Sequence, residues 1–424
     1  MAEDLSGSNI KGLGLSQNVL TVQTPDASLS GTEAGLASAL GSATSGAGSA
    51  ILFSAPGGVL ALGANDSLEI AATGAGFDVD AGLSLGEGLF KLTAAGVVNQ
   101  TAGSIVAGAL QGSSVGGAVL TEGGNKIAKL SGWSDASGAF ALTDAEALAV
   151  TGAVAAGDGI NLTTTTGGLS LSRALSTTSG GVTLDAAGTV VESAALGTIT
   201  AKAGELAVTS VGGVKLQAAN QVKSLSIANT GAGTVSYTET GALTVTSASN
   251  GAGGTLTLAD TTGEMNIAGA VTGGKVTLTS AGGLEETASG AITATTLVGS
   301  AAGTVNLSGA NQIATLGNFT DTAGAFALTN GEALKQSGTL NAGSQTVSLT
   351  ATAGNIAVDG TIEAGTLTLD SKAGALTESG AIGAIKVGTL NATAATGITL
   401  TGTHNDITTI GINSPGSGPD KITQ

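Results

Sequence analysis

The chain of 424 residues contains no cysteine, one histidine, four prolines and 2% aromatic residues. The absence of cysteine excludes disulfide bonds, but it does not by itself assign the chain to a cellular compartment. The prolines, Pro25, Pro56, Pro415 and Pro419, leave residues 57–414 without any. Because proline removes a backbone donor, this long interval is expected where strands are paired on both sides.

The scarcity of aromatic residues indicates a narrow core of Val, Leu, Ile and Ala. Phe140 and Phe326 each lie in the string Gly-Ala-Phe-Ala-Leu-Thr (326−140=186). We expect them to fill equivalent places in the core. Trp133 and Tyr237 occur once each and are expected to pack locally.

Basic residues are also few, with 13 Lys and Arg against 30 Asp and Glu, a net charge of −17 and a pI near 4.2. Nucleic acid is a poor partner for such a chain, because phosphate binding needs clustered Lys and Arg. No segment is apolar enough to insert into a membrane, and the N-terminus lacks the pattern of a signal peptide. Either the chain is a processed or excised piece of a longer protein, which we favour, or its export uses a signal elsewhere.

Two motifs repeat with one long period. The first, N-x-[IV]-x-x-L, begins at Asn125, Asn220, Asn311 and Asn405, in steps of 95, 91 and 94. The second is rich in Ala and Gly and places a glycine at Gly96, Gly188, Gly282 and Gly374, in steps of 92, 94 and 92. Such a period indicates a stack of supersecondary units that bury a core only together.

A shorter period lies inside the longer one. Between Leu243 and Thr279, strand centres fall at Val245, Leu256, Ile267 and Leu278, in equal steps (256−245=11). Aliphatic residues alternate with threonines around each centre, which is typical of half-buried strands, and glycine-rich turns separate them. An antiparallel sandwich would require a linker about every 100 residues, and none interrupts residues 60–410.

The sequence thus predicts an all-β fold, a right-handed parallel β-helix of about 20 residues per coil, with the long period spanning four or five coils. We expect an irregular cap or lead-in segment over residues 1–60, including a short helix over 31–40. The β-helix rod is expected over 61–410, as about 17 coils, and a linker or tail over 411–424.

The strings Gly-Thr-Leu-Thr-Leu, Gly-Lys-Val-Thr-Leu-Thr and Gly-Asn-Ile-Ala-Val, together with Leu307-Ser308-Gly309-Ala310-Asn311, resemble the passengers of filamentous-haemagglutinin-like adhesins. Those passengers belong to two-partner secretion and autotransporter systems. The resemblance covers about residues 60–410 and implies a right-handed parallel β-helix, surface display and adhesion. The chain lacks the asparagine-proline motifs of the family's secretion domain and any translocator, so it matches a central rod segment best.

Parallel β-helices also occur as polysaccharide lyases and hydrolases, which need carboxylates beside a basic group. Asp78 and Asp80 form the closest acidic pair on one side of a strand, but no Lys, Arg or His lies near them in the sequence. We interpret them as a solvated strand or turn pair, and predict no catalytic residues.

Calcium is a second possibility, because Glu192, Glu285, Glu286 and Glu378 recur at equivalent places. One long period separates these places, so they cannot share an ion, and the calcium-binding nonapeptide of β-rolls is missing. We interpret the glutamates as solvated turn residues and predict no metal site or cofactor, with surface-bound calcium as the weaker alternative.

Outward threonines resemble the T-x-T arrays of ice-binding β-helices. They occur in the pairs Thr244/Thr246, Thr255/Thr257, Thr277/Thr279 and Thr366/Thr368. Such an array must be unbroken from coil to coil, and Thr261, Thr262 and Asn266 are expected to interrupt it. The ordinary preference of threonine for strands explains the pattern without ice.

The four motif asparagines lie too many coils apart to form a continuous binding row. Asparagine is a common turn residue, so we expect Asn125, Asn220, Asn311 and Asn405 to form turns. His404, beside the last copy, has no other metal-binding residue nearby in the sequence.

The expected function is that of a non-enzymatic extracellular protein, the rod or stalk segment of a bacterial adhesin. Its expected partners are surface glycans or proteins of a host or of bacteria. The alternative is a structural subunit that assembles end to end with itself into an extracellular fibre or biofilm matrix. A polysaccharide lyase or hydrolase is the distant third reading. All of these place the chain at the cell surface or outside it.

Overall fold

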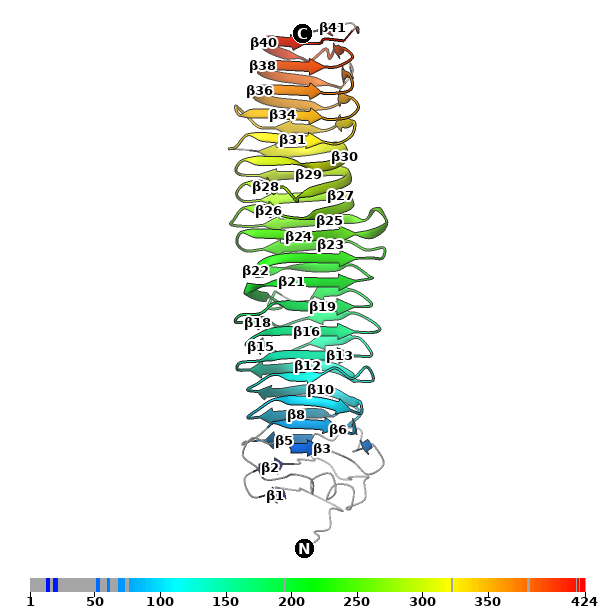
Figure 1. Ribbon diagram of the computed structural model, residues 1–424, viewed down its shortest axis with the longest axis vertical. Helices are drawn as coiled ribbons and strands as arrows, with labels where there is room; N and C mark the ends of the chain where they lie inside the picture. Colours follow the sequence, from blue (N-terminus) through cyan, green and yellow to red (C-terminus); the bar gives the residue numbers. More distant parts are fainter. Residues whose placement is uncertain are drawn as a thin grey trace. The chain divides into compact units, whose positions relative to one another are not determined.

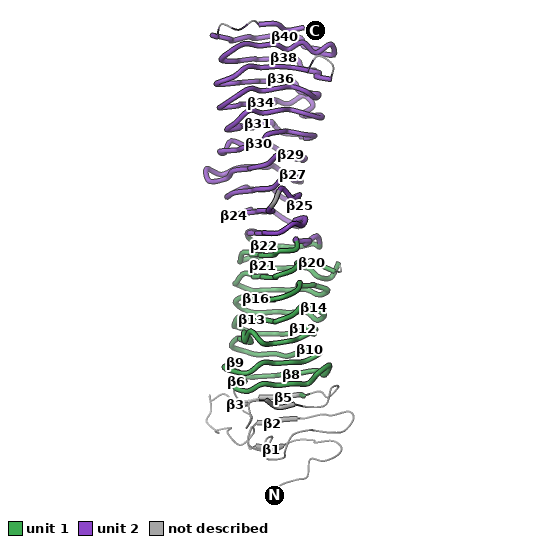
Figure 2. The backbone as a smooth tube through the Cα atoms, turned by 90° about the vertical axis from the view of Figure 1, so that its right-hand side faces the viewer, with its two compact units in different colours: residues 1–212, 218–223 green, residues 213–217, 224–424 purple. Residues whose placement is uncertain are grey.

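The computed structural model describes residues 76–424 except 194, 322, 380, 381, 417, 419 and 424, together with short strands between residues 13 and 72. The chain forms an all-β parallel solenoid of about 16 turns, with successive turns about 21 residues apart (Figure 1). This confirms the predicted parallel β-helix and its coil length. Two compact units can be distinguished, residues 1–212 with 218–223 and residues 213–217 with 224–424 (Figure 2).

The strands of the first unit are β1 (Leu13–Leu15), β2 (Asn18–Thr21), β3 (Ile51–Phe53), β4 (Val59–Ala61), β5 (Leu68–Ala72), β6 (Phe77–Asp80), β7 (Gly82–Ser84), β8 (Leu89–Ala94), β9 (Val98–Ala102), β10 (Ile105–Ser114), β11 (Ala118–Leu120), β12 (Lys126–Asp135), β13 (Ala139–Asp144), β14 (Leu148–Val150), β15 (Val154–Ala156), β16 (Gly159–Thr164), β17 (Leu169–Leu171), β18 (Leu175–Thr177), β19 (Val182–Ala186), β20 (Val190–Glu192) and β21 (Ile199–Ser210). Strand β22 (Val214–Asn229) contributes to both units.

The second unit continues with β23 (Val235–Glu239), β24 (Leu243–Asn250), the 3-10 turn η1 (Gly251–Gly253), β25 (Thr255–Asp260), β26 (Met265–Ile267), β27 (Ala270–Ser280), β28 (Leu284–Glu286), β29 (Ala291–Ala301), β30 (Val305–Asp321), β31 (Phe326–Asn330), β32 (Leu334–Gln336), β33 (Thr339–Asn341), β34 (Thr346–Ala351), β35 (Ile356–Val358), β36 (Thr361–Ser371), β37 (Leu376–Glu378), β38 (Ala384–Ala394), β39 (Ile398–Leu400), β40 (Asp406–Asn413) and β41 (Asp420–Ile422).

Each regular coil contains three strand positions, and each strand pairs with its counterpart in the next coil. In the first unit β13, β14 and β15 pair in parallel with β16, β17 and β18, through Phe140 and Ile160, Leu148 and Leu169, and Val154 and Leu175. In the second unit β31, β32 and β33 pair in the same way with β34, β35 and β36. The coil therefore has three faces around one core.

Alternation of residue type produces this arrangement. In β13 and β16 the buried positions alternate with half-buried or exposed ones, so the phenylalanine, isoleucine and leucines point inward. Each strand ends on a buried polar residue, Asp144 or Thr164. A buried leucine or phenylalanine contributes about 1.5–3 kcal/mol relative to an exposed one. Moving a strand by one residue would reverse both faces, so the hydrophobic pattern fixes the register.

The short period of the sequence corresponds to two of the three strand positions. Val245 pairs with Ile267, and Leu256 pairs with Leu278, so alternate strand centres stack on one another. The third position, where Ala248 of β24 pairs with Val271 of β27, was not predicted. In β24 and β27 the third position is occupied by one end of a longer strand that bends around a corner of the coil. No separate turn divides it from the rest of that strand.

Related segments occur in the two units. Residues 125–148 and 311–334 are identical at 14 of 24 positions. Both contain a ring pair in the core: Trp133 with Phe140, and Phe319 with Phe326, each with ring centroids 5.0 Å apart. The predicted equivalence of Phe140 and Phe326 and the local packing of Trp133 are confirmed. Tyr237 is also buried and donates to the Glu239 carboxylate.

At the ends, the predicted helix over 31–40 lies outside the described residues. Strands β3, β4 and β5 pair in parallel with β6, β7 and β8, whereas β2 pairs with β1 and with β5 in antiparallel fashion. Strand β41 pairs in parallel with β39. Part of the segment 411–424, predicted as a linker or tail, thus pairs in parallel with the preceding coil.

Candidate interaction face and buried polar corners

Outward side chains form columns, because paired strands are in register. One column in the first unit runs through Thr143, Thr163, Asp185 and Thr209, which follow one another at successive coils. A column in the second unit runs through Thr329, Thr350, Asp370 and Thr393 in the same manner. We call these the threonine-aspartate columns. Their residue types have the same order.

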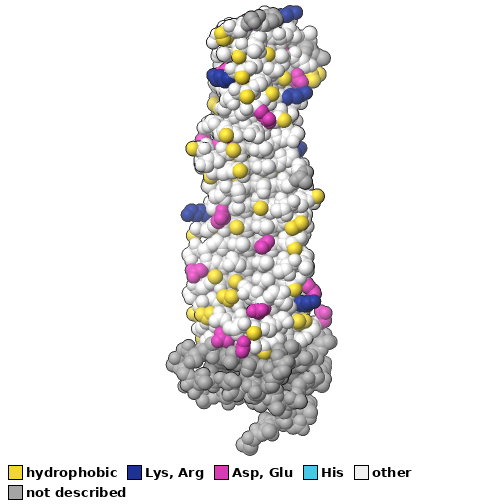
Figure 3. Space-filling view, turned by 45° about the vertical axis from the view of Figure 1, so that its right-hand side comes forward, with side chains coloured by type: hydrophobic (Ala, Val, Ile, Leu, Met, Phe, Trp, Pro, Cys, Tyr) yellow, Lys and Arg dark blue, Asp and Glu magenta, His cyan; other side chains and the backbone are white. Residues whose placement is uncertain are grey.

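The residues of both columns are exposed or half-buried, and neighbouring columns are also polar. In the second unit Thr346, Thr366 and Thr389 lie in register beside the column, as do Ser348, Thr368 and Asn391. Neighbouring rungs of such a sheet are about 4.8 Å apart. The result is a flat array of hydroxyl, amide and carboxylate groups. On the face that Figure 3 shows, the described surface is mostly uncharged, with scattered acidic and basic side chains.

The two columns are retained although buried residues of the same segments differ. Trp133 corresponds to Phe319, and Asp144 corresponds to Asn330, at the same offset (319−133=186, 330−144=186). Outward positions on a sheet face tolerate many polar residues. Retention of the order Thr, Thr, Asp, Thr therefore marks this face as the candidate interaction site.

The threonine pairs are interrupted at Asn266, as predicted, and also at Val298. Asn266 of β26 is paired with Thr244 of β24, so it ends the run of threonines at that place. Thr257 and Thr277 are in register, and Val298 is the residue that ends this pair. Thr366 lies in a column that stays polar from Thr346 to Thr409, whereas the column of Thr368 is bounded by Ala327 and Gly411.

Asp78 and Asp80 lie on the outward side of β6, as predicted. Asp78 accepts a hydrogen bond from Asn99 at 3.3 Å, and Asp80 accepts one from Thr101 at 3.1 Å. Both donors belong to β9, which pairs with β6. The structure therefore places each aspartate in a hydrogen-bonded pair with the next coil.

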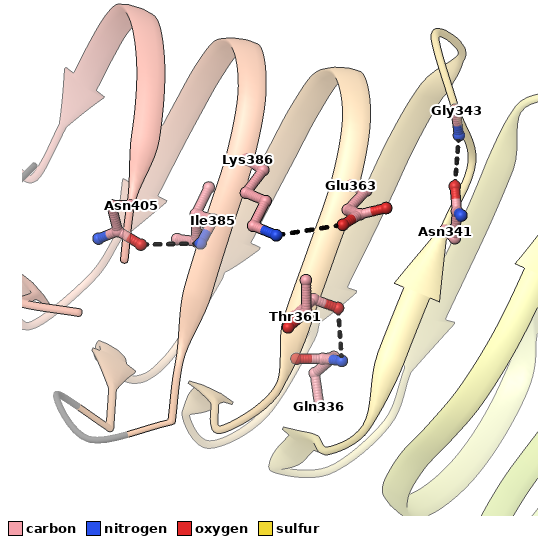
Figure 4. A network of polar contacts seen from close by, with 8 residues as sticks. All are labelled: Gln336, Asn341, Gly343, Thr361, Glu363, Ile385, Lys386 and Asn405. Carbon is pink, nitrogen blue, oxygen red and sulfur yellow. Dashed lines mark hydrogen bonds and ion pairs between the residues drawn. The ribbon is translucent and has the colours of Figure 1, made fainter. Parts of the chain in front are cut away.

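The motif asparagines occupy corners of the coil, and their side chains are buried. Each Oδ1 accepts the backbone N–H of an isoleucine in the preceding coil, at 2.7–2.8 Å: Ile105 for Asn125, Ile199 for Asn220, Ile292 for Asn311 and Ile385 for Asn405 (Figure 4). The predicted turn-forming role was thus wrong for these side chains, because they bind backbone groups inside the core. His404 is exposed and lies beside the Thr403 hydroxyl, with Nδ1 at 3.3 Å from its Oγ1.

The glutamates of the second motif meet these asparagines. Glu286 Oε2 accepts from Asn311 Nδ2 at 3.0 Å and from Gly309 N at 2.7 Å. Glu378 Oε2 accepts from Asn405 Nδ2 at 2.9 Å and from Gly402 N at 2.7 Å. Glu192 is half-buried and accepts from Ala218 N at 2.5 Å.

The prediction of solvated glutamates was therefore wrong for Glu286 and Glu378, which are each 8% exposed. Glu285, the neighbour of Glu286, does point outward and pairs with Asn306. The sequence showed both motifs, but it did not show that they meet in space. The available signal was their nearly constant separation (311−286=25, 405−378=27), a little more than one coil.

A further acid occupies the same corner in the first unit. Asp144 is fully buried, and its carboxylate accepts from Ile127 N at 2.7 Å and from Glu146 N at 2.8 Å. Burial raises the pKa of Asp144 to about 6, against the effect of these hydrogen bonds. In the second unit Asn330 accepts from Ile313 N at 2.8 Å in the corresponding place.

Charged side chains on the flanks form exposed or half-exposed ion pairs, such as Lys126 with Glu146 at 2.8 Å and Lys386 with Glu363 at 3.4 Å (Figure 4). Within the part of the chain that the structure describes, no three His, Asp or Glu side chains gather in a way that could hold a metal ion. No helix among the described residues is long and apolar enough to cross a membrane.

Comparisons of the chain with protein-family models, with curated proteins and with solved structures give no match.

Proposed function

We propose that this chain is the rod or stalk segment of a bacterial adhesin, a non-enzymatic protein displayed at the cell surface or secreted. In this proposal the threonine-aspartate columns and the polar columns beside them contact the partner, a glycan or protein on a host or bacterial surface. The in-register order Thr, Thr, Asp, Thr in both units is the observation that carries the proposal.

The chemistry of the columns suits such contacts. Threonine hydroxyls donate and accept hydrogen bonds, and the exposed carboxylate of Asp185 accepts them, whereas the Asp370 carboxylate already forms an ion pair with Lys372. The array is complementary to the hydroxyl groups of sugars or to polar protein surfaces. Each such contact contributes about 1 kcal/mol net. Two copies of the face on one chain would raise the avidity well above the affinity of either copy alone.

Attachment of beads coated with the purified chain to epithelial cells and to a bacterial biofilm tests this proposal. Thr163→Lys and Thr350→Lys place a cationic side chain in each column. The matched control carries Ser176→Lys and Thr399→Lys, which add the same charge on outward positions of other strands. We expect at least tenfold fewer attached beads for the column variant and no change for the control.

Equal losses for both variants would show that charge, and not the columns, governs attachment, and would contradict the proposal. Normal attachment of the column variant would contradict it as well. Electron microscopy of the same preparations separates the alternative, because a self-assembling subunit would form axial filaments.

A further inference from the structure

Gln100 and Glu286 occupy equivalent places in the two units (286−100=186), and each meets the motif asparagine of the following coil. Gln100 forms two bonds with Asn125. Its Oε1 accepts from Asn125 Nδ2 at 2.9 Å, and its Nε2 donates to Asn125 Oδ1 at 2.7 Å. Gln100 Nε2 also donates to the carbonyl oxygen of Gly103 at 2.7 Å. The Gln100 side chain thus contributes one acceptor, Oε1, and one donor, Nε2, to this corner.

Glu286 reproduces only the accepting half. Its Oε2 accepts from Asn311 Nδ2 and from Gly309 N, whereas its buried Oε1 has no hydrogen-bond partner. Glu378 shows the same division, because Oε2 accepts from Asn405 and Gly402 while the buried Oε1 has no partner. An ionised carboxylate has no proton to donate, but a protonated carboxyl has one donor, as the glutamine amide does.

Among the described residues that surround it, none carries a charge that compensates the Glu286 carboxylate. Its strand β28 pairs with β26 and β30, and Glu286 faces Ile267 of β26 and Asn311 of β30. The nearest acids on these elements, Glu264 before β26 and Glu285 on β28, are exposed and half-exposed, and Asp321 at the far end of β30 binds its own turn. Ionisation of a buried group without a counter-charge is costly.

We propose that Glu286 and Asn311 form a pH-sensitive latch: the protonated carboxyl of Glu286 closes this corner of the solenoid in acid, and its ionisation loosens the corner as the pH rises. Gln100 and Asn125 form a permanently closed version, because an amide does not ionise in this range.

Burial raises the pKa of Glu286 above its ordinary value of 4.5, against the hydrogen bonds from Asn311 and Gly309. Below the ordinary value both the folded and the unfolded states are protonated, and the latch contributes its full stability. As the pH rises, the unfolded state loses its proton first, so stability falls until the folded state has also ionised. The latch therefore acts above pH 4.5 and favours the acidic side.

Hydrogen exchange of the full-length chain, followed by mass spectrometry, tests the latch locally. The variant Glu286→Gln converts it to the amide form that already functions at Gln100. We expect peptides that cover residues 284–311 to exchange at least threefold more slowly than in the unmodified chain at about pH 8, and equally at about pH 4. The reciprocal Gln100→Glu should speed exchange of residues 98–125 at about pH 8 only.

Glu285→Gln is the matched control, because it removes the same charge from the neighbouring outward position of the same strand. It should leave the exchange of residues 284–311 unchanged at both pH values. Slower exchange of Glu286→Gln at both pH values, or no difference at either, would overturn the proposal. An equal effect of Glu285→Gln would overturn it too, since net charge would then be the cause.

Discussion

At the scale of single residues, some buried corner positions hold an acid in one unit and the corresponding amide in the other. The first unit has Gln100, Asn125 and Asp144, and the second has Glu286, Asn311 and Asn330 at the equivalent positions. Each set contains one acid and two amides. An amide satisfies the same backbone groups without the desolvation cost of a buried charge, so either unit provides a natural substitution for the other.

The variant Asp144→Asn gives the first unit the amide that the second unit has at Asn330. The pKa of Asp144 is raised from 3.8 to about 6, so its destabilising ionisation develops as the pH rises through that interval. We expect the variant to gain up to about 3 kcal/mol in the free energy of unfolding at about pH 8 and nothing at about pH 3. Urea unfolding at both pH values measures this, and a gain that did not depend on pH would contradict the assignment.

A second pair of residues differs between the units. Ser114 donates to the buried Asp135 carboxylate and accepts from Trp133 Nε1 at 3.1 Å. In the second unit Ala301 is paired with Asp321, and Asp321 Oδ2 is buried without a partner, while burial raises the pKa of this carboxyl.

Ala301→Ser should therefore supply the missing donor. We expect a gain of about 1 kcal/mol in the free energy of unfolding, and a loss of about 2 kcal/mol for Ser114→Ala in the first unit. Thermal or urea unfolding of the two variants gives both values. If Ala301→Ser destabilised the chain instead, the serine hydroxyl would not be donating to Asp321 Oδ2, and the prediction would be contradicted.

These residue-scale features could not be predicted from the sequence. Glu286 is buried because the neighbouring coils cover its strand. In the sequence, however, two adjacent glutamates indicate a polar turn. The asparagines were recognised as important because they repeat, but the backbone groups that they bind lie a whole coil away in the chain. The sequence could have indicated these contacts only through the coil length, because the glutamate and the asparagine of each pair are separated by a little more than one coil.

At the scale of elements, two glycines permit strands to pass beneath large rings. A Cβ atom at Gly112 would lie 2.2 Å from the Leu92 carbonyl oxygen and 2.6 Å from the Trp133 ring. At Gly299 it would lie 2.1 Å from the Leu278 carbonyl oxygen and 2.8 Å from the Phe319 ring. Both glycines lie at register shifts, where the strand turns from one face to the next.

Gly112→Ala or Gly299→Ala should therefore force the backbone or the ring to move. We expect a loss of about 3 kcal/mol in the free energy of unfolding for each, as for other overpacked cores. Gly123→Ala is the control, because nothing lies within 4 Å of its Cβ position. Equal stability of Gly112→Ala and Gly123→Ala would contradict the close packing at this corner.

Strands were the part of the fold that the sequence predicted best. The alternation of aliphatic and polar residues around Val245, Leu256, Ile267 and Leu278 specified four strands, and the structure contains them. The third face was missed because it has no separate strand: β24 and β27 continue around a corner, and Gly273-Gly274, which the sequence indicates as a turn, lies inside β27. The threonine-aspartate columns were missed because the number of residues from one coil to the next varies along them, as in the steps 163−143=20 and 209−185=24.

At the scale of the whole molecule, parallel register is the property from which everything else follows. It produces the outward columns, it brings the two repeated motifs together, and it lets each coil stabilise its neighbours. An antiparallel arrangement of the same strands would keep the aliphatic residues inside but would place different polar residues side by side. The candidate face and the buried corners would then not exist.

Cysteine cross-linking tests this directly, because the chain contains no cysteine of its own. In the structure Thr346 is paired with Thr366, and Thr350 with Asp370. Paired Cα atoms about 4.8 Å apart are within disulfide reach, whereas positions offset by four residues are more than about 12 Å apart.

The measurement is therefore the rate of disulfide formation in four double-cysteine variants, at positions 346/366, 350/370, 346/370 and 350/366. The account predicts rapid oxidation of 346/366 and 350/370 and none of the other two. Rapid oxidation of 346/370 and 350/366 instead would show antiparallel strands and would contradict the solenoid.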